Sequence, residues 1–168
     1  MIAPIQIDDL PLLLPLGFEA AWPAPLGQLP PTDLAAVVRS APSNAVRDEA
    51  MQNVVRGLLR AGGYKPSGRG KPSSEYLQRA ASEGPLPTIN PAVDTLNAVS
   101  LVSGIPISVV DLDRVKGTLS IKNGAPDAEY VFNASGQTIK VAGLLCLHDA
   151  DGPCANAVKD SQRTKTSP

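Results

Sequence analysis

Hydrophobic and polar residues follow two different rhythms along this chain, and the change falls at Gly104. Before Gly104, apolar residues recur every three or four positions, which is typical of amphipathic helices. After it, apolar and polar residues alternate with a period of two, which is typical of strands with one buried face. Helices followed by strands predict an α+β domain with a mixed, mostly antiparallel sheet packed with several helices.

Four helices are predicted before Gly104, each with a capping residue at its start, and the last three end at glycines. They cover residues 34–39, 43–61, 73–83 and 91–103. The expected caps are Thr32 or Asp33, Ser43, Ser73 and Asn90. The last helix has the clearest boundaries, because Pro91 suits a first helical turn and Gly104 suits a helix end.

Five strands are predicted after the last helix, separated by turn signals at Asn123-Gly124 and Ser135-Gly136. They cover residues 105–111, 117–122, 128–133, 137–141 and 144–149. The first of them leaves a Gly-x-Pro corner and is expected to be buried. The preceding helix is expected to pack on the sheet through its apolar side chains, which are Val93, Leu96, Val99 and Leu101.

The chain of 168 residues is long enough for one domain with one core. We therefore expect a single domain over residues 1–168, divided into four segments. Residues 1–30 are rich in proline and predict one or two short strands, and residues 31–104 are mainly helical. Residues 105–150 supply the strands, and residues 151–168 form a closing segment.

The composition is that of an ordinary globular protein, with 43% hydrophobic and 18% charged residues. The formal net charge of −1 excludes a generally basic surface, so any contact with nucleic acid must depend on a local patch. The apolar run over residues 10–18 follows two acidic residues and is interrupted by prolines, which argues against a signal peptide. No segment approaches the length of a membrane span. We expect a cytoplasmic protein without a membrane partner.

Asp94 and Asn97 form a polar pair on an otherwise apolar face of the helix at 91–103, because residues three apart share one face. Buried polar groups need partners. Asp94 is expected to cap a neighbouring turn. Asn97 is expected to be buried and hydrogen-bonded, either holding the bend at Gly104 or shaping the wall of a pocket.

A longer motif follows this pair. It reads Val93-Asp94-x-x-Asn97 and then Gly104-x-Pro106-x-Ser108-x-x-Asp111-x-Asp113-Arg114-Val115. This order resembles the editing domain of the bacterial phenylalanyl-tRNA synthetase beta chain, which is formed by the third and fourth modules of that chain and also occurs as a freestanding protein. Residues 71–77, 129–132 and 159–165 are similar to the freestanding proteins. The resemblance covers roughly residues 50–166 and implies the α+β fold of that editing domain.

The resemblance also implies site residues. Ser108 stands where the synthetase domain has a pocket histidine near the scissile ester, and Asp160 falls in the segment that supplies an acidic residue for substrate recognition. These two are the catalytic candidates. The substrate-binding candidates are Asn97, Pro106, Asp94, Asn156 and Ser161. With a serine in place of the histidine, the protein could bind a different amino acid, use water differently or have lost the chemistry. The alternative for Asp160 is that it lies in a charged, solvated tail.

The loop over residues 65–71 combines cations with glycines and a serine. Lys65, Arg69 and Lys71 are candidates for contacts with RNA phosphates. The same composition is also typical of a solvated mobile loop.

His148 is the only histidine, and it lies two residues after Cys146. On a strand these two side chains share a face, so the pair could form a nucleophile with its base, or with Cys154 part of a zinc site. The spacing matches no common zinc pattern, and a half-buried histidine beside a small hydrophobic residue is the simpler interpretation. We expect neither a metal nor a cofactor.

The sequence supports two main hypotheses for the function. The first is hydrolysis by water of a misacylated tRNA ester in trans, for which an activated ester needs a positioned water rather than a catalytic triad. The alternative is a non-catalytic module that binds a small molecule, an amino acid or RNA, so enzymatic activity stays open. The expected partner is tRNA or aminoacyl-tRNA, and no oligomeric state is assigned. A partnership with a synthetase through the Leu-rich N-terminus is a third possibility. If the family fold is kept, Ser108 and Asp160 should border one pocket large enough for an amino-acid side chain and the terminal adenosine of a tRNA. Whether Asn97 converges on the same cavity is the most useful observation.

Overall fold

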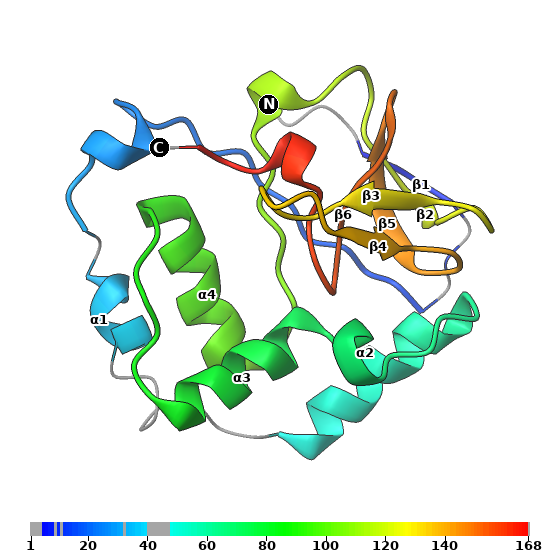
Figure 1. The fold of residues 1–168 in the computed structure, drawn as a ribbon, viewed down its shortest axis with the longest axis horizontal. Coiled ribbons are helices and arrows are strands. Elements are labelled where there is room, and N and C mark those ends of the chain that lie inside the picture. Colours follow the sequence, from blue (N-terminus) through cyan, green and yellow to red (C-terminus); the bar gives the residue numbers. More distant parts are fainter. Residues whose placement is uncertain (1–4, 9, 11, 32, 40–47, 168) are drawn as a thin grey trace.

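The computed structural model describes residues 5–8, 10, 12–31, 33–39 and 48–167, and its fold is α+β, as predicted (Figure 1). The helices are α1 (Leu34–Arg39), α2 (Glu49–Ala61), α3 (Ser73–Glu83) and α4 (Pro91–Ser103). The strands are β1 (Gln6–Ile7), β2 (Ser120–Asn123), β3 (Glu129–Val131), β4 (Thr138–Lys140), β5 (Leu145–Asp149) and β6 (Gly152–Asn156). Figure 1 shows α1, α3 and α4 on one side, the strands on the other, and α2 below the strands.

The larger sheet has the order β1-β2-β5-β6, and β3 and β4 form a separate hairpin. β1 runs parallel to β2, with Gln6 opposite Ser120, whereas the other neighbours are antiparallel. The predicted mixed, mostly antiparallel sheet is therefore confirmed. Within the described residues, no helix is long and apolar enough to cross a membrane.

The ends of the helices show which of the predicted capping residues were correct. Asn90 caps α4, since its side chain accepts a hydrogen bond from the Val93 N–H at 2.9 Å, and Gly104 ends the helix with a left-handed φ of 73°. Asp48 caps α2 by accepting from two backbone N–H groups. The caps predicted at Ser43 and Thr32 lie outside the described residues. Ser73 begins α3 as its first helical residue and not as its cap.

α2 meets the strands through Leu59, and the prediction that α4 packs on the sheet is wrong. Leu59 of α2 is almost fully buried in a cluster with Val141, Leu144, Cys146 and Val158. α4 instead packs on α1 and α3, where its Leu101 meets Ala81. Val99 of α4 remains 49% exposed, and Val93 and Leu96 are half-buried. The apolar residues of α4 surround the helix, so their spacing does not identify one buried face.

A close backbone contact helps to seat α2 on the strands. A Cβ atom on Gly62, which follows α2, would collide with the carbonyl oxygen of Gly143 in the turn before β5. Only glycine at this position allows so close an approach. The end of α2 is therefore fixed against the turn between β4 and β5.

Two parts of the strand prediction need correction. Residues 105–111 are extended but pair with no strand among the described residues. Pro106 has no N–H to contribute to a ladder, and the segment instead makes isolated bonds to the chain end, such as that from the Asp111 N–H to the Thr164 carbonyl at 2.9 Å. The strand β6 was not predicted, because its Gly-Pro start is typical of a turn. The hairpin β3–β4 and its turn at Gly136, with φ 76°, are as predicted.

Candidate functional site

Ser108 and Asp160, the two catalytic candidates, are brought together by the fold. Ser108 lies in the extended segment after α4, and Asp160 lies in the turn after β6. The Ser108 hydroxyl is 2.7 Å from Oδ1 of Asp160 and 3.2 Å from the Asn156 carbonyl oxygen. The backbone N–H of Asn156 also donates to Oδ1 of Asp160, at 3.2 Å.

The Asp160 carboxyl has an unusual protonation equilibrium. Burial raises its pKa to about 6, although hydrogen bonds from Ser108 and from the Asn156 backbone, together with the charge of Lys165, act in the opposite direction. Ser108 beside it is exposed to solvent. A carboxylate with a pKa near neutrality can accept a proton from a water molecule at this edge.

Asn156 holds the turn on which Asp160 sits. Its side-chain oxygen accepts from the N–H groups of Val158 and Lys159, at 2.8 and 3.0 Å, and its side-chain nitrogen bonds the hydroxyl of Tyr130. The Tyr130 hydroxyl donates to the Lys159 carbonyl at 2.5 Å, and burial raises the pKa of this phenol, so it stays protonated. The Asn156 side chain is thus occupied by the turn. This arrangement favours a positioning role over the substrate contact that the resemblance implied.

An ion pair fixes the segment that follows Asp160. Arg163 binds the Asp149 carboxylate through two nitrogens, at 2.7 and 2.8 Å, and the Asp149 side chain is fully buried. The Arg163 guanidinium is the main cause that holds the Asp149 pKa at about 2, although burial acts against it. Ser161, another substrate-binding candidate, is buried and accepts from the Arg163 N–H. The sequence does not predict this ion pair, because two residues 14 positions apart give no local signal.

The polar pair of α4 does not join this site through hydrogen bonds. Asp94 is buried and accepts from the Ile89 N–H at 2.8 Å, which confirms the predicted turn cap. Asn97 is half-buried and forms no side-chain hydrogen bond to the part of the chain that the structure describes, so the expectation of a buried, bonded amide is wrong. Pro106 is half-buried two residues before Ser108. Ser108 and Asp160 are joined by a hydrogen bond, and no hydrogen bond links Asn97 to either of them.

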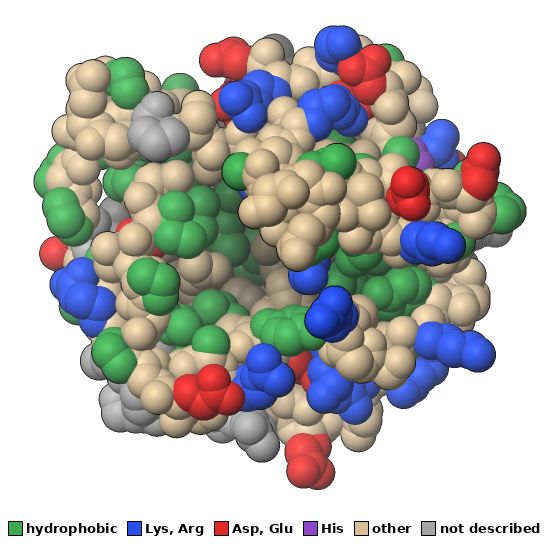
Figure 2. All heavy atoms as spheres, viewed as in Figure 1, with side chains coloured by type: hydrophobic (Ala, Val, Ile, Leu, Met, Phe, Trp, Pro, Cys, Tyr) green, Lys and Arg blue, Asp and Glu red, His purple; other side chains and the backbone are tan. Residues whose placement is uncertain are grey.

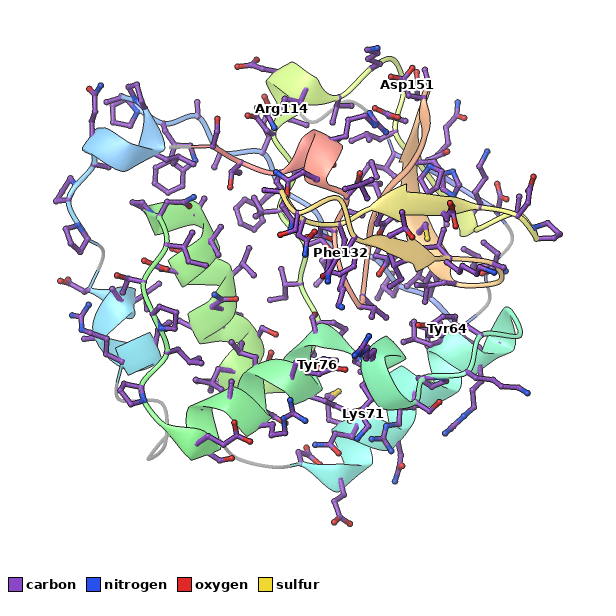
Figure 3. The ribbon with its side chains drawn as sticks, viewed as in Figure 1. Tyr64, Lys71, Tyr76, Arg114, Phe132 and Asp151 are labelled. Atoms are coloured by element: carbon purple, nitrogen blue, oxygen red, sulfur yellow. The ribbon has the colours of Figure 1, made fainter. Side chains whose placement is uncertain are left out.

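A basic region adjoins the turn that carries Asp160. Two surface hollows of about 620 Å³ each share Arg69 and Lys159 in their linings. The first is also lined by Gly68, Lys71, Tyr76 and Arg79, and the second by Phe132, Gly136, Gln137 and Thr138. Figure 2 shows Lys and Arg side chains gathered around the centre of this face, and Figure 3 places Lys71 and Tyr76 on the helical side and Phe132 on the strand side. Lys65 lines neither hollow.

Aromatic rings hold two of these cations. The Lys159 ammonium lies 4.0 Å from the centroid of the Phe132 ring, and the Arg79 guanidinium lies 5.3 Å from that of Tyr76. The Tyr76 hydroxyl donates to the Gly68 carbonyl at 2.8 Å, so α3 fixes the loop that carries Arg69 and Lys71. The sequence identified these two cations but not Arg79 or Lys159.

The Cys146 and His148 pair shows no sign of nucleophilic chemistry. Both side chains are buried, and burial raises the pKa of the Cys146 thiol to about 12, so the thiolate is scarce at neutral pH. Burial also lowers the pKa of His148, whose Nε2 finds no hydrogen-bond partner among the described residues. Among the described residues, no group of three or more His, Cys, Asp or Glu side chains is placed to hold a metal ion.

The chain is similar to one protein family and to several known proteins. The B3/4 domain family matches residues 65–167, which is more than half of the chain. The beta subunit of phenylalanine–tRNA ligase from Brucella abortus (strain 2308) is 32% identical over 83 residues, and the same values hold for that subunit from Brucella suis biovar 1 and from Brucella melitensis biotype 1. The match covers 49% of this chain but 10% of each relative. The chain therefore corresponds to a small part of those subunits.

Proposed function

Because the chain belongs to the B3/4 domain family, we propose that it binds the acylated end of a tRNA and hydrolyses a misacylated ester in trans. The relatives that it matches are beta subunits of a phenylalanine–tRNA ligase, which supports a tRNA as the partner. The site for such chemistry is the pair formed by Ser108 and Asp160. This function also supports the expected cytoplasmic location.

The single observation that carries the proposal is the 2.7 Å hydrogen bond between the exposed Ser108 hydroxyl and the Asp160 carboxylate, whose pKa is raised to about 6. In the proposed reaction a water molecule loses a proton to Asp160 and attacks the ester carbonyl. The bond between the carbonyl carbon and the ribose oxygen then breaks, the ribose oxygen takes up a proton, and the free amino acid leaves. Ser108 orients the water or the carbonyl oxygen.

This reaction does not need a catalytic triad. An aminoacyl ester is already activated, so positioning of the water and the ester supplies much of the rate enhancement. The geometry suits the division of roles, because Asp160 is held from two sides while Ser108 faces solvent. The RNA backbone would run past the neighbouring Lys159 toward Arg69 and Lys71, which keep their predicted role as phosphate contacts.

The test is release of the amino acid from a panel of correctly and wrongly charged tRNAs. We expect at least one wrongly charged tRNA to be hydrolysed faster than its correct counterpart, and Asp160→Asn, which keeps the shape of the side chain, to abolish this difference. Asp127→Asn is the matched control, since Asp127 is an exposed residue of the turn before β3. Activity of Asp160→Asn equal to that of wild type would remove Asp160 from the mechanism.

The second candidate is a binding module without chemistry. It is favoured by the serine at position 108, where the related synthetase domain has a histidine, and by the hydrogen bonds that the Asp160 carboxylate already accepts from Ser108 and from the backbone of Asn156 and Val109. Binding of charged tRNA without hydrolysis of any of them would establish this alternative.

A further inference from the structure

We propose that residues 13–18, the docking segment, pair as an added strand with the open sheet edge of a partner protein whose contact surface is apolar and bordered by Lys and Arg. The docking segment lies between β1 and α1, outside the residues matched by the B3/4 family and apart in sequence from Ser108 and Asp160. The proposal is therefore independent of the proposed function and concerns the N-terminal part of this chain.

The docking segment exposes a row of large apolar side chains. Its even-numbered residues are 86% to 93% exposed, whereas Leu13 and Pro15 between them are half-buried. The exposed residues are Leu14, Leu16 and Phe18. Residues two apart share one face of an extended chain, so these side chains form one row. Single exposed apolar residues are common on protein surfaces, but a contiguous row marks an interaction site.

The backbone of the docking segment is free to pair. Residues 13–18 belong to no helix, strand or turn, and the backbone groups of residues 14–18 form no hydrogen bond with any residue that the structure describes. In an extended chain, successive N–H groups point to opposite edges. Pro15 lacks an N–H and falls on one edge, so Leu14, Leu16 and Phe18 present the other edge without interruption. Such an edge can pair with the open edge of another sheet.

The docking segment is already held in place by its own chain. A Cβ atom on Gly17 would be 3.6 Å from Cδ1 of Ile5, so the two residues lie side by side just before and after the turn that follows β1. Figure 1 shows this part of the chain, in blue, crossing from the strands toward α1. A segment that is held in extended form loses less conformational entropy on binding than a disordered peptide does.

The charges around the docking segment select the partner. Asp8 and Glu19 are exposed on either side of it, and no Lys or Arg precedes Arg39 in the sequence. Antiparallel pairing with a second copy would bring Glu19 of each copy near Asp8 of the other, and parallel pairing would place Glu19 opposite Glu19. Like charges opposite one another destabilise a strand pair, and an anionic lipid surface would repel the same carboxylates. A partner with cations beside an apolar sheet edge is complementary to both features.

The first experiment measures fluorescence anisotropy of a labelled strand peptide with the full chain. The peptide alternates valine and threonine and has a lysine at each end. We expect binding that becomes about fivefold weaker when both lysines are replaced by glutamate, since the charges lie at the rim of the contact. Leu14→Ser combined with Leu16→Ser should weaken binding at least about tenfold, because burial of these side chains supplies much of the affinity. Val54→Ser combined with Val102→Ser is the matched control, since these side chains are 68% and 58% exposed on α2 and α4.

Amide hydrogen exchange of the same complex tests the pairing edge. In the free protein the amides of residues 14–18 should exchange without protection, because they form no hydrogen bond to the described residues. Saturating peptide should slow the exchange of Leu14, Leu16 and Phe18 but not that of Gly17. Equal protection of Gly17 would show that the segment does not pair as a strand.

Further outcomes decide between the possible occupants. A wild-type dimer in sedimentation that becomes monomeric in the Leu14→Ser, Leu16→Ser variant would place a second copy on the segment and overturn the proposal. Flotation with phosphatidylcholine vesicles that the same variant loses would overturn it in favour of a lipid surface. Failure of wild type to bind the lysine peptide would also overturn it. Circular dichroism and thermal unfolding confirm that both double variants are folded, and none of these outcomes depends on hydrolysis of a charged tRNA.

Discussion

The hydroxyl of Ser108 and the carboxylate of Asp160 lie 2.7 Å apart, joining the segment after α4 to the turn after β6. Asn156, Tyr130 and the ion pair of Arg163 with Asp149 hold this turn from the other side. The site is therefore built from residues that are distant in the sequence, and its properties can be tested one interaction at a time.

Asp160 should make the protein less stable as the pH rises. Its pKa is raised from the ordinary value of 3.8 to about 6 in the folded state, so the stabilising contribution is present below the ordinary value and is lost as the pH rises through 6. We expect a loss of about 2 kcal/mol in the free energy of unfolding between about pH 4 and about pH 7, at about 1.4 kcal/mol per pKa unit. Urea unfolding of wild type and of Asp160→Asn at both pH values measures it. The same pH dependence in both proteins would contradict the assignment to Asp160.

The rate of ester hydrolysis should follow the ionisation of the same group. A base must be deprotonated, so kcat/KM should rise tenfold per pH unit below the Asp160 pKa of about 6 and level off above it. The measurement is a pH–rate profile for the best substrate, corrected for spontaneous hydrolysis. A profile without a bend near pH 6 would show that Asp160 is not the base.

Arg163→Met should destabilise the protein by about 3–5 kcal/mol, because it leaves the buried Asp149 carboxylate without its partner. The difference in stability between wild type and Arg163→Met should become smaller below about pH 4. In wild type the Asp149 pKa is about 2, and it returns toward its ordinary value when the arginine is absent, so the variant loses less stability on acidification. Lys116→Ala is the control, because it removes a solvent-exposed ion pair with Asp151 and should cost less than about 1 kcal/mol. Equal costs would mean that the buried pair is no stronger than the surface pair.

Asn156→Leu should cost about 1–3 kcal/mol, since the N–H groups of Val158 and Lys159 lose their acceptor. Asn97→Leu should cost less, because Asn97 is half-buried and its side chain bonds to none of the described residues. Chemical denaturation of the two variants makes the comparison directly. If Asn97→Leu lowered the free energy of unfolding more than Asn156→Leu, the Asn97 amide of α4 would be the one that stabilises the fold.

Leu59→Ala should lower the free energy of unfolding by about 2–5 kcal/mol, because Leu59 is 1% exposed in the main core cluster. Val54→Ala in the same helix should change it by less than about 0.5 kcal/mol, since Val54 is 68% exposed. The comparison tests whether α2, which lies outside the residues matched by the B3/4 family, belongs to the same folding unit. A separate unfolding transition for α2 would argue against it.

Local signals made much of the fold predictable. The ends of α4 follow from Asn90 and Gly104, and the turn of the β3–β4 hairpin follows from Ser135-Gly136, because each signal acts within a few residues. Which surface α4 covers depends on other helices, and its apolar residues lie on several sides of the helix. The strand β6 forms because β5 offers it a partner, and that information lies outside its own sequence.

The site was predictable in part for the same reason. Ser108 and Asp160 came from a resemblance to a known family, and the structure then supplied their contact. The sequence places Lys159 in a polar closing segment, whereas in the structure its ammonium group lies over the ring of Phe132. A lysine in a polar stretch does not reveal which ring it will lie on.

The parallel pairing of β1 with β2 determines when β1 can pair while the chain is being synthesised. Gln6 is made well before its partner Ser120, and closing so long a loop has an entropic cost that local hairpins avoid. β1 must therefore wait, unpaired, until β2 is made, whereas α1 to α4 precede β2 in the chain and can already form. Since β1 contributes only two residues to the ladder, amide exchange should find it among the first strands to open and the last to close.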